Sequence, residues 1–151
     1  MVELRRAIEI LRDRLAVPYP LAHAKPFVGA GRKLLLEAQT EARVPGEYCL
    51  VAIAGGQQTL TPASESFYER VDWDGDLASG WRPAEDRKSP VRIRPYQRFG
   101  LPAIGGVKTE TVWEHVDAGE DPHEVASELE LTTEEVYWAL AYETSARSRA
   151  S

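Results

Sequence analysis

The fold is decided by the stretch VASELELTTEEVYWAL at residues 125–140. Apolar residues recur at helical spacing on both sides of a short polar break, and the small Ala126 allows two helices to approach closely. Thr132 in the break is followed three residues later by Glu135, the pattern of a capping box at a helix start. The stretch therefore predicts two helices joined by a short turn, as in a helix-turn-helix.

A further helix is predicted immediately upstream, over residues 109–118, and Gly119 is placed to end it. Asp121 and Pro122 then supply an N-cap and a first-turn proline for the second helix, and the third helix is expected to run to about Thr144. Glu130 stands in the turn where glycine is common, so we expect a less tight turn. The predicted shared core comprises Val112, Val116, Val125, Ala126, Leu129, Leu131, Val136, Ala139 and Leu140.

At the N-terminus, Leu4, Ile8, Leu11 and Leu15 recur at spacings of four, three and four, which predicts a helix over residues 2–16. Prolines at positions 18 and 20 end it. A helix of this length is marginal alone in water. It therefore needs a packing partner, either within the chain or in a segment that the chain lacks.

Residues 26–100 show short β-type runs separated by turn residues. We expect strands at the runs 27–28, 33–36, 48–54, 58–61, 67–73 and 91–94, with a hairpin turn at 29–32 and a loop at 81–86. The sequence thus predicts an α+β chain with a small irregular β region. Its expected parts are an N-terminal helix (1–17), a β-rich region (18–100), a three-helix domain (101–146) and a tail (147–151).

The charge is distributed unevenly along the chain. Residues 106–145 contain eleven Asp and Glu against Lys108 alone, a net charge of −10. DNA affinity comes largely from Lys and Arg that neutralise phosphates, so this helix-turn-helix should repel DNA. Two interpretations remain open: a structural bundle with solvated acids, or a protein-binding face centred on Tyr137 and Trp138, which we expect to point outward beside Thr132, Thr133 and Glu134.

A basic segment from Arg87 to Arg98 precedes the acidic region. Arg92 and Arg94 would share one face of a strand, and Tyr96 and Phe99 could stack on bases, which makes a nucleic-acid-binding regulator the alternative function. A solvated or internally paired edge strand is the simpler explanation, since Lys and Arg on an edge discourage aggregation. We favour the edge strand, with Arg92, Arg94 and Arg98 kept as candidate nucleic-acid contacts.

No set of side chains suggests catalysis. His23, His115 and His123 are not spaced with Cys, Asp or Glu as in zinc sites, and His115 beside Glu114 is expected to be solvated. The run 72–76 lacks the downstream glutamate of a calcium loop, and the glycine pairs lack the lysine of a phosphate loop. We therefore expect no enzyme activity, metal or cofactor. No apolar stretch suits a membrane span or a secretory signal, so the cytoplasm is the expected location.

The chain resembles a known family at several motifs. RFGLPAIGGVKT at 98–109, AGEDP at 118–122 and the stretch 125–140 are similar to the domain of unknown function 433, typical of VapB-type antitoxins encoded beside PIN-like ribonuclease toxins. Motifs similar to a subgroup of these antitoxins lie at 5–12, 20–22, 31–34, 56–57 and 67–71. The resemblance implies a bacterial antitoxin of a type II toxin-antitoxin pair, often dimeric, with DNA bound mainly by an upstream winged-helix module whose last helix would be residues 1–17.

The resemblance also implies a partner with clustered carboxylates that hold a metal, because PIN-like nucleases have such a site. A guanidinium pairs bidentately with carboxylates and competes with a metal. We hypothesise that aromatic residues dock the helical domain on the partner while an arginine of the tail reaches its acidic site; a disordered, solvated tail is the alternative. The candidate partner-binding residues are Trp113, Tyr137, Trp138, Tyr142, Arg147 and Arg149.

Overall fold

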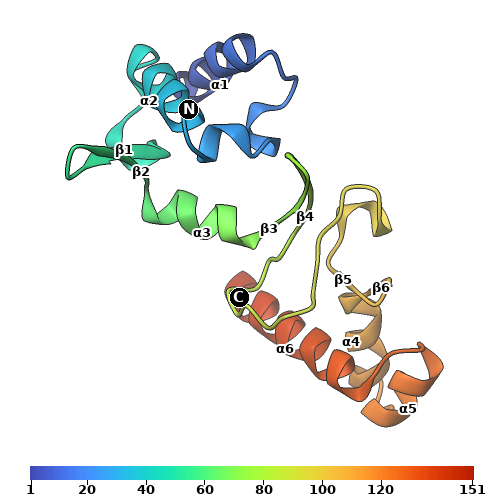
Figure 1. Ribbon diagram of the computed structural model, residues 1–151. Coiled ribbons are helices and arrows are strands. Elements are labelled where there is room, and N and C mark those ends of the chain that lie inside the picture. Colours follow the sequence, from blue (N-terminus) through green and yellow to red (C-terminus); the bar gives the residue numbers. More distant parts are fainter. The chain divides into compact units, whose positions relative to one another are not determined.

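A computed structural model describes residues 1–151, and the chain divides into two compact units, Met1–Ala78 and Ser79–Ser151. The chain combines six α-helices with three small two-stranded sheets (Figure 1), so the predicted α+β class is confirmed. The division falls within a strand. The boundaries that the sequence suggested after residues 17, 100 and 146 stay predictions.

Most of the regular structure is helical. The α-helices are α1 (Val2–Leu15), α2 (Gly31–Glu41), α3 (Pro62–Arg70), α4 (Thr109–Asp117), α5 (Pro122–Glu128) and α6 (Thr133–Ala150). Short 3₁₀ turns occur at η1 (Pro20–Ala22), η2 (Lys25–Phe27), η3 (Gly46–Tyr48) and η4 (Arg98–Gly100). None of the helices combines the length and the apolar character needed to span a bilayer.

The strands form three separate two-stranded sheets. They are β1 (Val51–Ala54) with β2 (Gln57–Leu60), β3 (Val71–Asp74) with β4 (Leu77–Trp81), and β5 (Ala103–Ile104) with β6 (Val107–Lys108). β1 and β2 pair antiparallel around the two-residue turn Gly55-Gly56, as predicted, with Val51 opposite Leu60. Isolated hairpins of this size are marginal in water, so side chains from helices must hold them.

In the first unit α1 packs against α2 and buries Leu11. Leu35 and Ala38 of α2 and Val51 of β1 complete this core, and all four residues are at most 3% exposed. The predicted N-terminal helix is confirmed, and its packing partner is α2 in the same chain.

Three runs predicted as strands in this unit differ from the structure. Phe27 belongs to η2, residues 33–36 belong to α2, and residues 67–70 belong to α3, so that only the end of the run 67–73 is a strand, in β3. The hairpin predicted at 29–32 therefore does not form. Gly31 starts α2 where an added Cβ would lie 1.7 Å from the Lys25 carbonyl oxygen, an approach that only glycine permits. Pro62 in the first turn starts α3. In the second unit, the run 91–94, which was also predicted to be a strand, forms isolated bridges instead.

One buried side chain takes the place of a missing strand neighbour. The Gln39 amide of α2 donates from Nε2 to the Val51 carbonyl oxygen at 2.5 Å. Its Oε1 accepts from the backbone amides of Leu50 at 3.1 Å and of Val51 at 3.3 Å. Gln39 thereby pairs the backbone groups at the start of β1 and holds the hairpin on α2.

Replacement of Gln39 by leucine should destabilise the first unit by about 2 kcal/mol or more. The substitution keeps the volume but leaves buried backbone groups of β1 without partners, each costing roughly 1–3 kcal/mol. Urea unfolding followed by circular dichroism measures the change, with exposed Thr40→Leu on the same helix as control. Equal stability of the two variants would contradict the role of Gln39.

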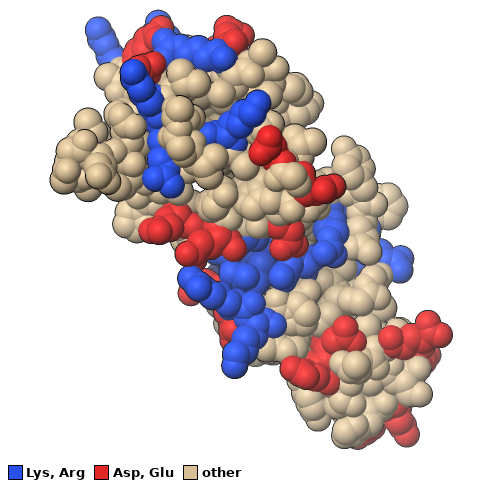
Figure 2. Space-filling view, viewed as in Figure 1, with Lys and Arg blue, Asp and Glu red and all other residues tan.

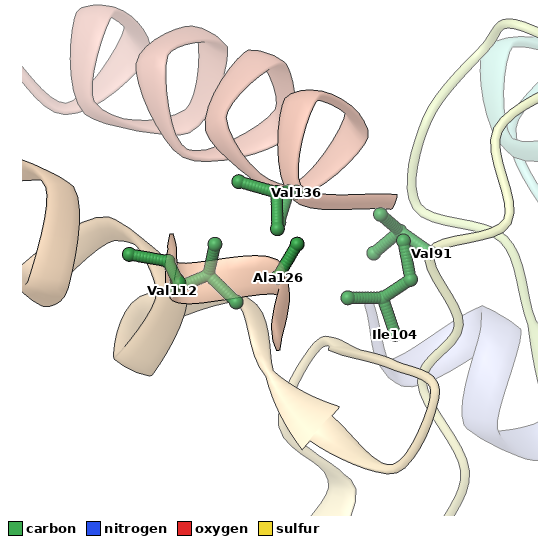
Figure 3. Close-up of a cluster of buried hydrophobic side chains, with 7 residues drawn as sticks. Val91, Ile104, Val112, Ala126 and Val136 are labelled. Carbon is green, nitrogen blue, oxygen red and sulfur yellow. The ribbon is translucent and has the colours of Figure 1, made fainter. Parts of the chain in front are cut away.

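In the second unit α4, α5 and α6 enclose one hydrophobic cluster. Figure 3 shows Val112 of α4 and Val136 of α6 converging on Ala126 of α5, with Val91 and Ile104 on the far side. All nine predicted core residues lie in this cluster or pack against it, so the predicted core is confirmed. Val91 and Ile104 were not predicted to belong to it.

The turn between α5 and α6 has the geometry of a tight helix C-cap. The Leu131 amide donates to the Ala126 carbonyl oxygen at 2.8 Å, and Glu130 adopts the left-handed conformation with φ 55°. The expectation of a looser turn is therefore wrong, because Glu130 accepts the strained conformation. The predicted capping box is confirmed: Thr132 Oγ1 accepts from the Glu135 amide at 3.1 Å, and Glu135 Oε2 accepts from the Thr132 amide at 2.7 Å.

The last helix is longer than predicted. α6 continues to Ala150, well past the expected end at Thr144, so residues 147–150 are helical. Arg147 and Arg149 therefore occupy fixed helical positions.

Replacement of Glu130 by glycine should stabilise the protein by about 1 kcal/mol. Glycine adopts positive φ without steric cost, whereas other L-residues pay roughly 1–2 kcal/mol there. Chemical denaturation measures the gain. Glu130→Ala is the matched control, since alanine removes the charge but retains the strain, and an equal gain in both variants would refute the explanation.

Candidate partner-binding surface

A groove of about 200 Å³ runs along one side of α6. Trp138, Tyr142 and Arg149 line it from the helix, and Ala84, Glu85 and Ser89 line it from the preceding loop. The helix residues are separated by four and seven positions, so they share one face of α6. The structure thus brings together three of the six residues predicted to bind a partner.

The aromatic walls of the groove are anchored in the core. Trp138 and Tyr142 are partly buried and pack against the hydrophobic cluster, so the prediction that Trp138 points outward is wrong. Burial, followed by the nearby Glu143 carboxylate, raises the pKa of Tyr142. The Tyr142 hydroxyl therefore stays protonated at neutral pH and can donate a hydrogen bond into the groove.

Opposite charges stand at the rim of the groove. Arg149 and Glu85 are both exposed there. A guanidinium can hold a carboxylate with two parallel hydrogen bonds, and the neighbouring rings offer apolar contact. Arg149 can thus hold an acidic side chain of another protein beside an apolar or aromatic one, while Glu85 can pair with a basic side chain.

A buried carboxylate links α4 to α6. Glu143 is 9% exposed, and its Oε1 accepts a hydrogen bond from the Thr109 hydroxyl at 2.6 Å. Its Oε2 pairs with Arg147 Nε at 3.5 Å, and the Arg147 guanidinium lies 4.9 Å from the centre of the Trp113 ring. Arg147 and Trp113 therefore form a cation–π contact within the chain.

The predicted partner-binding residues consequently fall into separate groups. Trp138, Tyr142 and Arg149 form the groove, whereas Trp113 and Arg147 form an internal cation–π pair. Tyr137 is 53% exposed and does not line the groove. Tyr137 and Trp138 therefore do not form the centre of one shared surface.

A second exposed surface lies in the loop at residues 96–101. Tyr96 and Phe99 are 103% and 95% exposed, and Arg98 and Phe99 both have positive φ, 50° and 57°. Arg98 Nε donates to the Gly106 carbonyl oxygen at 2.5 Å and fixes the loop. Strained backbone of this kind persists only where surrounding contacts impose it and is frequent at functional sites. The sequence predicted that both rings could stack on bases, but it did not predict that they are fully exposed.

The candidate nucleic-acid contacts make bonds within the chain. Arg92 Nη1 donates to the carbonyl oxygens of Ser89 at 2.7 Å and of Val91 at 2.9 Å, and Arg94 Nη1 to Gln97 Oε1 at 3.4 Å. These bonds shape the segment that carries Val91 into the core. Arg92 therefore has a structural role beside any contact with a ligand.

Carboxylates dominate the far end of this unit. Figure 2 shows Asp and Glu, and no Lys or Arg, over the region where Figure 1 places α5. His115 at the end of α4 lies among these acids, with Nδ1 2.9 Å from Glu120 Oε2. The hydrogen bond to Glu120 raises the pKa of His115. His115 is partly buried and bonded, not solvated as expected.

The comparisons with known proteins agree with this architecture. Residues 91–142 match the family described as "Protein of unknown function (DUF433)". Over 148 residues the chain is 28% identical to the uncharacterized protein Rv2308 of Mycobacterium tuberculosis, covering 94% of this chain and 61% of that protein. The chain thus spans about three fifths of this relative's length.

A solved structure shares the fold. The crystal structure of Rv2018 from Mycobacterium tuberculosis matches with a TM-score of 0.71 at 21% sequence identity. The match covers 93% of this chain and 68% of the other. The likeness therefore extends over both compact units.

Replacement of Thr109 by valine should destabilise the second unit by about 1–3 kcal/mol, because Glu143 loses its buried donor while the shape is nearly kept. Denaturant unfolding measures the change. Thr111→Val, on the same helix and partly buried, is the control, and it should cost much less. Equal losses would show that the hydrogen bond to Glu143 is unimportant.

Proposed function

We propose that this chain is the antitoxin of a type II toxin-antitoxin pair, which binds and neutralises a PIN-like ribonuclease and has no turnover of its own. The observation that carries the proposal is the α6 groove, in which Trp138, Tyr142 and Arg149 converge. Aromatic residues and arginine are the types most enriched at the energetic centres of protein interfaces. The class of the partner follows from the family resemblance, with which the DUF433 match of residues 91–142 is consistent.

Electrostatics favour a protein partner over DNA for the helical module. Residues 106–145 have a net charge of −10, and the exposed surface at α5 is acidic. A recognition helix in such a field would be repelled by phosphates. In this proposal DNA is bound mainly by an upstream module of the same antitoxin, and the protein acts in the cytoplasm, where dimerisation would pair two such modules.

The contacts of the two arginines favour Arg149 as the one that would inhibit the nuclease. Both are exposed, but Arg147 is engaged by Glu143 and by the Trp113 ring, whereas Arg149 lines the groove. A nuclease that holds its metal with clustered carboxylates offers a bidentate acceptor for Arg149. We therefore assign docking to Trp138 and Tyr142, and competition with the metal to Arg149.

Blocking the groove should abolish complex formation. Ser145 lines the groove and is exposed, so Ser145→Trp fills it without altering the core. We expect affinity for the ribonuclease encoded beside this gene to fall at least about tenfold, the loss of one strong interface contact. Calorimetry with the purified nuclease measures it. Ser127→Trp, exposed on α5 outside the groove, should bind as the unaltered protein does.

Arg149→Ala separates docking from inhibition. We expect the variant to bind the nuclease and yet leave RNA cleavage largely active, because the aromatic walls remain while the competing guanidinium is lost. Full neutralisation by Arg149→Ala would eliminate the arginine mechanism. A neighbouring gene that encodes no nuclease, or unchanged affinity in Ser145→Trp, would count against the proposed function itself.

A nucleic-acid-binding regulator is the second candidate, favoured by one observation. Tyr96 and Phe99 are fully exposed beside Arg98, within the basic segment from Arg87 to Arg98. Exposed rings next to arginines can stack on the bases of a single strand. Steeply salt-dependent binding of an oligonucleotide, lost in Tyr96→Ala/Phe99→Ala, would support this candidate, and binding that is absent or indifferent to salt would end it.

A further inference from the structure

Three metal-ligating side chains meet where α4 passes into α5. His115 belongs to the last turn of α4, Glu120 to the connection, and Glu128 is the last residue of α5. Each offers one ligand atom, and these atoms all lie within 4.8 Å of one another. Intervals of five and eight residues match no familiar metal motif, so only the fold brings these residues together.

We propose that His115, Glu120 and Glu128 form a binding site for one divalent transition-metal ion, of which Zn²⁺ fits best. Zinc takes four ligands in tetrahedral arrangement, and imidazole with two carboxylates and one water supplies them. Calcium needs six to eight oxygen ligands and magnesium a near-ideal octahedron, which three side chains including an imidazole do not provide. The donor atoms of these three side chains therefore favour zinc over calcium and magnesium.

The geometry needs only a small adjustment to hold an ion. His115 Nδ1 lies 2.9 Å from Glu120 Oε2, somewhat closer than the roughly 3.4 Å between two ligand atoms of a tetrahedral zinc, and the proton of this hydrogen bond would leave when the ion binds. His115 is held by partial burial, with 27% of its side chain exposed, while the Glu120 side chain is 40% exposed. Glu128 is exposed, so its flexible side chain can close the remaining distance.

The surroundings attract a cation. His115 lies at the C-terminal end of α4, where the helix dipole contributes partial negative charge. Glu114 adds a further carboxylate near His115, and the acidic module as a whole raises the local concentration of cations. The partner-binding groove uses none of these three ligands, so the inference is independent of the proposed function.

Metal binding would tie the end of α4 to the end of α5. Because an unfolded chain does not assemble the three ligands, an ion that binds the folded form stabilises it by mass action. The three-helix module would then have two restraints on α4: the Thr109–Glu143 hydrogen bond at its start and the metal at its end.

The test is a calorimetric titration of the full chain with zinc chloride in a buffer that does not chelate metal. We expect one saturable site per chain and an increase in Tm that EDTA reverses and that magnesium does not produce. His115→Ala and Glu128→Gln should each weaken zinc binding at least about tenfold, the usual scale for loss of a metal-site interaction.

His123→Ala supplies the matched control, because His123 is an exposed histidine of the same module outside the cluster. Its zinc affinity should stay within about twofold of the unaltered protein, since a factor of two is only a few tenths of a kcal/mol. Glu128→Gln keeps the size of the side chain, so retained folding in circular dichroism makes its loss of affinity interpretable. The proposal is overturned if no saturable site is found, or if His115→Ala binds zinc as tightly as His123→Ala.

Discussion

The buried carboxylate of Glu143 is the constraint on which the helical module depends. A carboxylate that leaves water must find charge and hydrogen-bond donors, or its burial costs several kcal/mol. Thr109 supplies a hydrogen bond at 2.6 Å and Arg147 an ion pair at 3.5 Å. The Thr109 bond joins the start of α4 to α6, and the Arg147 guanidinium lies over the Trp113 ring of α4. Another side of α6 carries Trp138, Tyr142 and Arg149, which line the groove.

In the first unit, too, a buried polar side chain of a helix pairs with groups that would otherwise lack a partner. Its hairpin of β1 and β2 has only two strands, so the edge of β1 lacks a neighbour. The Gln39 amide presents a donor and an acceptor, as a peptide group does, and pairs the backbone of Val51 at the start of that edge. Both units therefore use one buried polar side chain of a helix to hold the element beside it.

The elements that the sequence predicted correctly are those whose signals lie within a few residues of one another. The three-helix module was predicted with its core and capping box because Thr132, Glu135 and the apolar periodicity act within a few residues. α2 was missed because Leu34 to Leu36 suit a strand equally well, and the packing of Leu35 and Ala38 against Leu11 of α1 comes from a distant part of the chain. The cluster of His115, Glu120 and Glu128 was missed because the angle between two helices, not a spacing, assembles it.

The difference between Arg147 and Arg149 shows why the length of α6 matters to function. The sequence predicts both arginines to lie in a C-terminal tail and does not distinguish between them. Continuation of the helix to Ala150 places Arg147 one turn beyond Glu143, on the face that packs against Trp113, and Arg149 on the face of Trp138 and Tyr142. The first guanidinium neutralises the module's own buried acid. The second lines the groove next to two aromatic rings, where it can meet a carboxylate of another protein.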